Sequence, residues 1–165
     1  MTQQFLLQMA GEPGSGKSAL ARVIGRRTGA VVLDKDVLKT AALHAGAEEA
    51  LAGSLAYEAF FDLAGHLLGQ GLSVVLDSPS FYHTIPEKGQ AVADKRGVRY
   101  HFVECMCDDK AELERRLAGR PRLDSQPGAT ESADRDTVAP LGAYLRVDTL
   151  QPIERCLELV LEYVG

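Results

Sequence analysis

The stretch GEPGSGKS, from Gly11 to Ser18, carries residue types that can hold a polyphosphate. It matches the pattern G-x-x-x-x-G-K-[ST], in which glycines let backbone N–H groups surround an anion, the lysine reaches the β and γ phosphates, and the hydroxyl can bind Mg²⁺. An apolar run before it and a helical pattern after it supply the strand and the helix that the pattern requires. We therefore expect ATP to be held by Gly11, Gly14, Ser15, Gly16, Lys17 and Ser18.

Two aspartates, Asp34 and Asp36, follow the second apolar run in the sequence VVLDKDVLK. If the strand continues through both, their spacing places both carboxylates on one side, at the edge where open parallel sheets bind ligands. Phosphoryl transfer needs one carboxylate to orient the acceptor's hydroxyl and another to hold the water shell of Mg²⁺. We expect Asp36 to take the first role and Asp34 the second. The alternative is that Asp34 caps a following helix and Asp36 is solvated in its first turn.

A third acid, Asp77, ends the apolar run LSVVLD and precedes the turn-forming sequence Ser-Pro-Ser. A carboxylate at the end of such a strand, beside a phosphate-binding loop, can hold Mg²⁺ directly or through water. The metal set expected from the sequence is therefore Ser18, Asp34 and Asp77. The alternative for Asp77 is a purely turn-forming role.

A long polar segment, residues 120–136, is rich in Pro, Gly, Ser and Asp and is expected to be a mobile lid. Arginines precede and occupy it: Arg115, Arg116, Arg120, Arg122 and Arg135. Because phosphoryl transfer spreads negative charge over oxygens, paired N–H donors of Arg suit it, and a closing lid excludes water. Arg116 and Arg120, spaced four apart, are expected to share a helical face and to act in catalysis with Lys17 and Asp36, and Arg116 is also expected to bind the nucleotide. The alternative is that basic residues simply favour the end of a helix.

The elements that position these residues follow from hydrophobic patterning. Apolar runs at 4–10, 30–33, 72–76, 98–106 and 144–147 alternate with helical patterns at 18–27, 54–70, 109–119 and 153–164. Runs rich in Val and Leu suit strands that are buried on both faces, so the chain is expected to be an α/β protein with a parallel sheet. Asp109 and Glu112 have the spacing of a capping box at the start of the third helix.

Composition narrows the class of protein further. At 165 residues and 45% hydrophobic composition, the chain is expected to form one domain, 1–165. The net charge of −5 argues against broad affinity for nucleic acid or a membrane surface. Cys105, Cys107 and Cys156 form no CxxC pair, which favours a reducing compartment, taken as the cytoplasm. The N-terminal apolar run is too short for a membrane span.

The chain resembles the small P-loop kinases, a family that includes shikimate and gluconate kinases, chloramphenicol phosphotransferase and the kinase half of polynucleotide kinases. It is most similar to the AAA-type predicted kinases of bacteria. The resemblance rests on GEPGSGKSALARVIGRR, LDKDVLK, GLSVVLDSPS, ERRLAGR and LRVDTLQPIERCLELV. It implies a P-loop NTPase fold, a three-layer α/β/α sandwich with strand order 2-3-1-4-5, and ATP with Mg²⁺. It also implies that Asp36 orients the acceptor, that Arg116 and Arg120 are lid arginines, and that residues 146–149 lie near adenine.

Two departures from the family's pattern bear on the acceptor. Many relatives carry Asp-x-x-Arg after the second strand, whereas here the fourth residue is Lys39. The segment SPSFYHTIPEK, read as a loop after Asp77, has His83 near the expected acceptor side but no cluster of residues for an anionic substrate. Shikimate and gluconate are therefore disfavoured as acceptors.

The function expected from these residues is ATP-dependent phosphorylation of a hydroxyl on a small molecule such as a drug, nucleoside or sugar. A nucleic-acid 5′-hydroxyl kinase is the first alternative, disfavoured because Lys39 is the only Lys or Arg between residues 37 and 70. The second alternative is an ATP-binding regulator or weak ATPase that has no acceptor. The protein is expected to be a monomer or a homodimer, with no membrane partner.

Overall fold

The computed structural model describes residues 3–126 and 136–165. Strands and helices alternate along the chain. In order they are β1 (Phe5–Ala10), α1 (Lys17–Thr28), β2 (Val31–Asp34), α2 (Lys35–His44), α3 (Glu49–Gly69), β3 (Val74–Asp77), α4 (Thr84–Arg96), β4 (Arg99–Met106), α5 (Lys110–Gly119), β5 (Leu145–Asp148) and α6 (Ile153–Val164).

The five strands form one parallel sheet in the order β2-β3-β1-β4-β5. Parallel neighbours need a crossover connection, which the intervening helices provide. β1 lies at the centre, where Leu7 is paired with Val75 on one side and with His101 on the other. The α/β class and the strand order expected from the sequence and its resemblance are confirmed.

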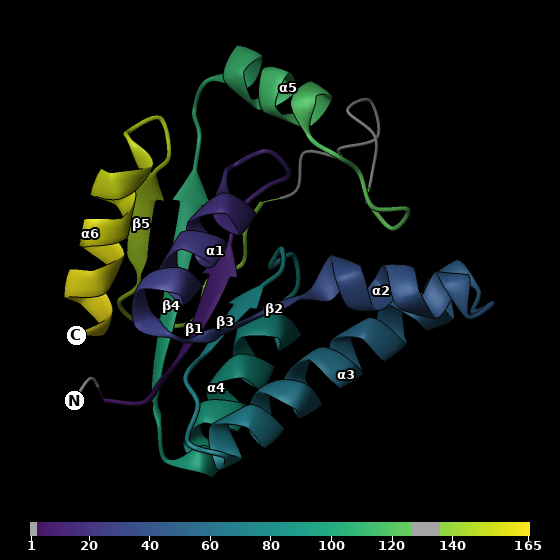
Figure 1. Cartoon of the computed structure of the whole chain (residues 1–165), viewed down its shortest axis with the longest axis vertical. Helices are drawn as coiled ribbons and strands as arrows, with labels where there is room; N and C mark the ends of the chain where they lie inside the picture. The colour runs from purple at the N-terminus through teal and green to yellow at the C-terminus, as the bar shows by residue number, and fades with distance from the viewer. Residues whose placement is uncertain (1–2, 127–135) are drawn as a thin grey trace.

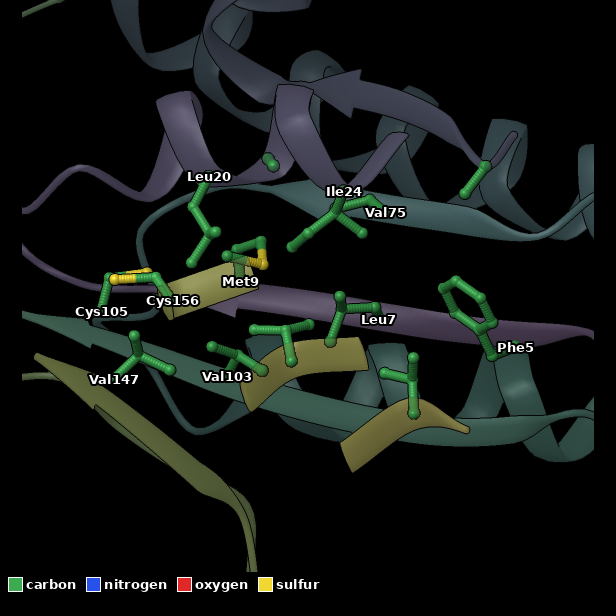
Figure 2. Packing of buried hydrophobic residues seen from close by; sticks show 14 residues of the cluster. Phe5, Leu7, Met9, Leu20, Ile24, Val75, Val103, Cys105, Val147 and Cys156 are labelled. Carbon is green, nitrogen blue, oxygen red and sulfur yellow. The ribbon is translucent and has the colours of Figure 1, made fainter. Parts of the chain in front are cut away.

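Helices cover both faces of the sheet and make a three-layer sandwich (Figure 1). Because successive side chains of a strand point to opposite faces, β1 contributes to two separate cores. Phe5, Leu7 and Met9 pack with α1 and α6, as Figure 2 shows for the side of α1 that carries Leu20 and Ile24. The opposite face packs against α3 and α4.

Helix α4 was not expected from the sequence, α2 was expected only under the capping alternative for Asp34, and α3 is longer than expected. α3 begins at Glu49 rather than at Ser54, and α4 covers part of the segment that was read as a loop after Asp77. α4 buries mainly Ile85 and the small residues Gly89 and Ala93, so its inward face carries little apolar signal. The small face is required, since a Cβ on Gly89 would lie 2.0 Å from the Gln8 side chain.

The capping box at α5 is half confirmed. Asp109 caps the helix by accepting a 3.1 Å hydrogen bond from the Glu112 N–H. The Glu112 carboxylate does not complete the box, because it binds Arg115 and Arg116 instead.

The lid expected at residues 120–136 is only partly described, since residues 127–135, Arg135 among them, lie outside the described part of the chain. Residues 120–126 follow α5 and pack toward α2, while Val138 exchanges hydrogen bonds with Ser80 at 2.7 Å and 2.6 Å. Within residues 3–126 and 136–165, none of the helices is long and apolar enough to span a bilayer.

Candidate functional site

The loop between β1 and α1 has the backbone shape of a phosphate cradle. Gly11, Gly14 and Gly16 adopt positive φ angles of 140°, 85° and 87°, which L side chains rarely adopt. The N-cap of α1 is Gly16, which has no side chain that could bind the first N–H groups of the helix, and an anion can take that place. A Cβ on Gly11 would lie 2.5 Å from both the Cys105 carbonyl and the Ser15 hydroxyl, so the loop also needs glycine for space.

A cavity of about 450 Å³ opens beside this loop. It is lined by Lys17 and Ser18 from the loop, by Arg116 and Arg120 from the end of α5, and by residues between Thr149 and Cys156. We call it the phosphate-loop cavity. Most of the expected nucleotide residues meet here, and the stretch after β5 adds Gln151, Ile153 and Cys156, for which no site role was expected.

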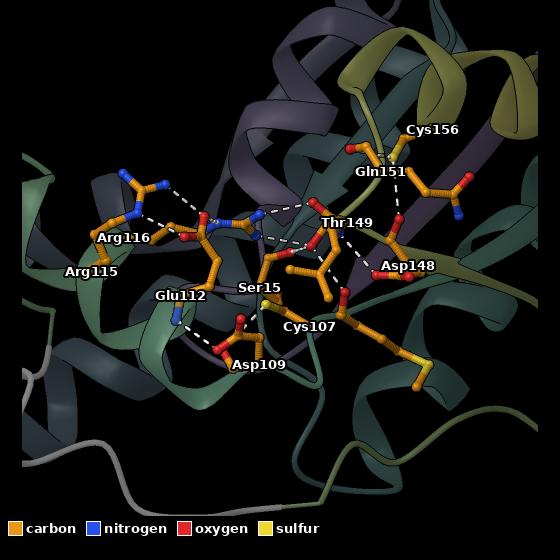
Figure 3. Close-up of polar contacts among 12 residues, drawn as sticks. Ser15, Cys107, Asp109, Glu112, Arg115, Arg116, Asp148, Thr149, Gln151 and Cys156 are labelled. Atoms are coloured by element: carbon orange, nitrogen blue, oxygen red, sulfur yellow. Dashed lines mark hydrogen bonds and ion pairs between the residues drawn. The ribbon is translucent and has the colours of Figure 1, made fainter.

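Arg116 is held firmly at the wall of this cavity. Its Nε donates to Glu112 at 2.7 Å, and its two terminal nitrogens donate to the hydroxyl and the carbonyl of Thr149 at 3.0 Å and 2.8 Å (Figure 3). The Thr149 hydroxyl in turn lies 2.6 Å from the Ser15 carbonyl and 2.9 Å from the Met106 carbonyl. Thr149 therefore connects α5, the phosphate loop and the ends of β4 and β5.

The other two arginines near the end of α5 differ from Arg116. Arg115 points to solvent and binds only Glu112 among the bonds described, so it does not line the cavity. Arg120 comes just after the last residue of α5 and has an extended backbone. The expectation that Arg116 and Arg120 share one helical face is therefore wrong. Arg120 nevertheless lines the cavity, with its Nε buried and lacking a hydrogen-bond partner among the described residues.

Asp77 lies at the carboxyl end of β3, paired across the sheet with Asp34 of β2. It is only 4% exposed, and its Oδ1 has no hydrogen-bond partner among the described residues. Burial raises the pKa of Asp77, partly offset by the positive charge of Lys17 and a hydrogen bond from Ser18, while the charges of Asp34 and Asp36 raise it further. A cation would relieve this buried, unsatisfied carboxylate.

The donors at this point fit Mg²⁺ held together with a nucleotide. No group of three or more His, Cys, Asp or Glu side chains within the described ranges could hold a metal ion by itself. Mg²⁺ commonly uses one or two protein ligands, several waters and substrate phosphates, so it does not need such a cage. Ser18 and Asp77 supply a hydroxyl and a carboxylate beside Lys17.

The strand does not continue through the two aspartates of the LDKD sequence. β2 ends at Asp34, whose carboxylate accepts a 2.8 Å hydrogen bond from the Asp36 N–H and caps α2. The arrangement in which both carboxylates lie on one side of a strand is therefore wrong, and the capping alternative for Asp34 is confirmed. Asp34 still lies opposite Asp77 in the sheet, which keeps it close to the expected metal position.

The same alternative expected Asp36 to be solvated, but its carboxylate has partners on the protein. Lys35 Nζ lies 2.6 Å from its Oδ1, and Gln126 Nε2 donates to its Oδ2 at 3.2 Å. Burial raises the pKa of Asp36, but Lys35, Gln126 and the positive charge of Lys17 outweigh burial and lower it overall. Asp36 is thus an ionised carboxylate close to the phosphate loop, outside the walls of the phosphate-loop cavity.

Lys35 and Tyr57 are site residues that the sequence reasoning missed. Lys35 is buried at the start of α2, and its ammonium lies 5.5 Å from the centre of the Tyr57 ring. Burial raises the pKa of Tyr57 to about 12, with a further contribution from the negative charge of Asp36. A lysine between two aspartates was the available signal for Lys35, whereas Tyr57 gave none.

Lys39, which takes the place of the arginine in the family's Asp-x-x-Arg pattern, is engaged in an ion pair. Its ammonium pairs with Glu49 at the start of α3. Glu12 of the phosphate loop lines a second cavity of about 370 Å³, together with Glu104, Asp108 and Asp136, rather than the phosphate-loop cavity. Cys105 and Cys107 are buried, as expected of residues that fill the core.

Known proteins share this sequence pattern and fold. A family model described as an AAA domain matches residues 6–139. A candidate kinase from Chloroflexus aurantiacus J-10-fl has a TM-score of 0.77 at 19% identity, with 99% of this chain and 97% of that chain covered. The APS kinase of Mycobacterium tuberculosis, solved with AMPPNP and APS, has a TM-score of 0.69 at 21% identity, with 98% of this chain and 98% of that chain covered. A gluconokinase from Sinorhizobium meliloti 1021 has a TM-score of 0.64 at 18% identity, with 99% of this chain and 91% of that chain covered.

At these identities, the structural likeness establishes the fold. Among curated proteins, no sequence matches the chain closely enough to count as a relative.

Proposed function

Since this chain belongs to the AAA-domain family, we propose that it is an ATP-dependent kinase that transfers the γ-phosphoryl group to a hydroxyl of a small molecule. The observation that carries the proposal is the position of Lys17. Its charge acts on Asp77, at the expected metal position, and on Asp36, which lies outside the walls of the phosphate-loop cavity. A phosphate held at Lys17 would therefore have a nucleotide site on one side and an ionised carboxylate on the other.

The nucleotide side would bind and orient the triphosphate. The open N-terminus of α1 and the glycine backbone N–H groups surround the phosphates, and Lys17 reaches the β and γ phosphates. Arg116 and Arg120 meet negative charge from the α5 side of the cavity. Mg²⁺, when bound, would neutralise charge shared by the β and γ phosphates, and Ser18 and Asp77, with Asp34 beside them, are the residues that would hold it.

Asp36 would orient the acceptor. Its carboxylate accepts a hydrogen bond from the acceptor's hydroxyl and takes the proton as the new oxygen–phosphorus bond forms. A carboxylate with a lowered pKa is a weak base, which suffices for a loose transition state in which the nucleophile needs orientation more than early deprotonation. Tyr57, close to Asp36, adds an aromatic surface on the acceptor side.

A small neutral acceptor suits the charges around this side better than a nucleic acid does. Lys39 is paired with Glu49, and Lys88 with Glu58 at 2.5 Å, so these two lysines offer little free positive charge to a polymer of phosphates. A polymer of phosphates would need a basic groove leading to Asp36. Similarity to a sugar kinase from Janibacter sp. HTCC2649, with a TM-score of 0.68 at 17% identity, 98% of this chain and 94% of that chain covered, supports a small-molecule acceptor.

We also propose the domain organisation, the oligomeric state and the compartment of the protein. The chain is a single domain, 1–165, that works as a monomer or a homodimer. Three free, buried cysteines support a reducing compartment, taken as the cytoplasm.

The test is transfer of labelled γ-phosphate from ATP to a panel of neutral sugars, nucleosides, hydroxyl-bearing drugs and 5′-hydroxyl oligonucleotides. We expect a small-molecule acceptor to be labelled. Asp36→Asn should reduce that transfer by roughly 10²-fold or more while ATP still binds. Asp62→Asn, which changes an exposed acid of α3, is the matched control and should leave transfer unchanged.

Two results would contradict the proposal in different ways. If nothing in the panel is labelled and ATP hydrolysis is unchanged in Asp36→Asn, the protein is an ATP-binding regulator or weak ATPase. If Lys17→Ala binds ATP as well as the unmodified protein does, the nucleotide site itself is misassigned.

A further inference from the structure

Gln126 closes a hydrogen-bonded turn, residues 123–126, in the described segment after α5. Its backbone N–H donates to the Leu123 carbonyl at 2.9 Å, and its side-chain Oε1 accepts from the Leu123 N–H at 3.2 Å. Arg122 donates to the Gln126 carbonyl at 3.2 Å. Because the Leu123 N–H requires an oxygen, the nitrogen of the Gln126 amide faces away from the turn.

That nitrogen faces Asp36. Gln126 Nε2 lies 3.2 Å from Asp36 Oδ2, and the Ser125 hydroxyl donates to the Asp36 backbone carbonyl at 2.9 Å. Thr40, one turn further along α2, donates to the Ser125 hydroxyl at 2.9 Å. The turn is thus fastened along α2 and directs one N–H toward the carboxylate proposed to receive the acceptor.

Both oxygens of this carboxylate already have a donor. Lys35 is bound to Oδ1 and Gln126 to Oδ2. Lys35 belongs to the same helix as Asp36, whereas Gln126 comes from a separate segment, the one that follows α5. The Gln126 N–H thus occupies one of the two lone-pair positions of Oδ2, and an acceptor hydroxyl that donates at that position must replace it.

We propose that Gln126 is a positioning residue that makes this site select an alcohol acceptor over water, by holding Asp36 Oδ2 until an acceptor displaces it. The inference rests on the proposed phosphoryl transfer at Asp36. A water molecule gains only one hydrogen bond when it replaces the Gln126 N–H at Asp36. The Gln126 amide is part of the same chain and therefore competes with water at a high effective concentration. A small-molecule acceptor brings binding energy from its non-reacting parts, which can offset the displacement of Gln126.

The reaction that Gln126 suppresses is hydrolysis. A water oxygen bonds to the γ phosphorus, the bond between that phosphorus and the bridging oxygen of ADP breaks, and a water proton passes to Asp36. In transfer to the acceptor the same bonds form and break, with the acceptor's hydroxyl oxygen in place of the water oxygen. Removing the Gln126 donor should therefore increase hydrolysis that occurs without any acceptor.

The experiment measures the rate of ATP hydrolysis at saturating ATP, without acceptor, in two variants. Gln126→Met keeps the length of the side chain and adds no charge beside Asp36 but loses the N–H that faces it, and Gln126→Ala also shortens the side chain. We expect both variants to hydrolyse ATP roughly tenfold faster than the unmodified protein, the scale of one hydrogen bond to a charged group. Asp124→Asn is the matched control, because Asp124 binds His44 at 2.6 Å from the same turn without touching Asp36.

An unchanged or lower rate in Gln126→Met overturns the inference, even if Gln126→Ala is faster, because the effect would then belong to the shape of the turn and not to the N–H. An equal increase in Asp124→Asn overturns it for the same reason. Lys17→Ala should abolish hydrolysis in every background. Hydrolysis that survives Lys17→Ala would count against the proposed function itself, so the two failures can be told apart.

Discussion

The ammonium of Lys35 lies 2.6 Å from Oδ1 of Asp36 and over the ring of Tyr57. A buried lysine is rare unless it is paired, and here its partner is the carboxylate proposed to orient the acceptor. The pair keeps Asp36 ionised in a place where burial alone would favour the neutral acid. The charge state of the acceptor side is therefore determined within the first turn of α2.

Replacing Lys35 by Met should slow phosphoryl transfer and move the acidic limb of its pH profile to higher pH. Burial raises the pKa of Asp36 and Lys35 lowers it, so removal of the cation leaves the effect of burial less opposed. Asp36 is active when ionised, and a higher pKa means that more of it is protonated at a given acid pH. The pH dependence of transfer to a panel acceptor measures this. Lys39→Met, whose cation pairs with Glu49, is the control, and an equal shift there would contradict the assignment.

Gly11→Ala should abolish ATP binding and destabilise the fold more than Gly46→Ala does. Both glycines have positive φ angles, 140° and 91°, so both substitutions carry backbone strain of about 1 kcal/mol. Only at Gly11 does the added Cβ collide, at 2.5 Å from the Cys105 carbonyl, whereas nothing lies within 4 Å at Gly46. Urea denaturation and calorimetric ATP titration measure the two effects. Equal losses of stability in the two variants would show that the close approach at Gly11 is unimportant.

Thr149→Val should lower the free energy of unfolding by about 1–3 kcal/mol and weaken ATP binding. Valine has a similar shape but leaves the Ser15 carbonyl and one nitrogen of Arg116 without their hydroxyl partner. Thr149→Ser keeps the hydroxyl and should behave nearly as the unmodified protein. Urea denaturation with ATP titration provides the measurement. If Val and Ser are equivalent, the hydroxyl does not hold Arg116 and the loop together.

His101→Phe should remove part of the loss of stability at acid pH. Burial lowers the pKa of His101 from 6.5, and the positive charge of Arg99 lowers it further, so the folded protein keeps the ring neutral. As the pH falls through 6.5, the unfolded chain binds a proton that the folded chain does not, and stability decreases until the lower folded pKa is passed. Phenylalanine cannot titrate and can keep the ring contacts with Phe5 and Tyr163.

Unfolding free energies between about pH 5 and 7.5 measure this difference. His66→Phe, at an exposed position on α3, is the control and should keep the pH dependence of the unmodified protein. If His101→Phe keeps it as well, another group is responsible.

Much of the nucleotide side could be predicted from the sequence because its chemistry is local. Gly11 to Ser18 are consecutive, with the strand β1 directly before them and the helix α1 beginning at their end. Asp77 could be placed because it ends an apolar strand, and the ends of parallel strands meet at one edge of the sheet. The Val- and Leu-rich runs likewise predicted the α/β class.

The acceptor side was predicted less completely, for two physical reasons. Whether Asp36 continued a strand or entered a helix depended on the cap formed by Asp34, and both outcomes were compatible with the pattern. α4 buries small residues against Gln8 and Tyr100, so its helical period has little apolar contrast. In such segments, packing against the sheet decides the conformation, and packing is not encoded in the neighbouring residues.

The sequence by itself determined that a phosphate loop follows a buried strand, that acids end the next two strands, and that arginines precede a polar segment. Only the tertiary structure decided which of these groups contact one another. Gln126 reaches Asp36 across 90 positions of chain, and Thr149 reaches Ser15 across 134. Hydrogen bonds over such separations leave no periodic trace in a single sequence, because they arise from the crossing of elements that hydrophobic burial brings together.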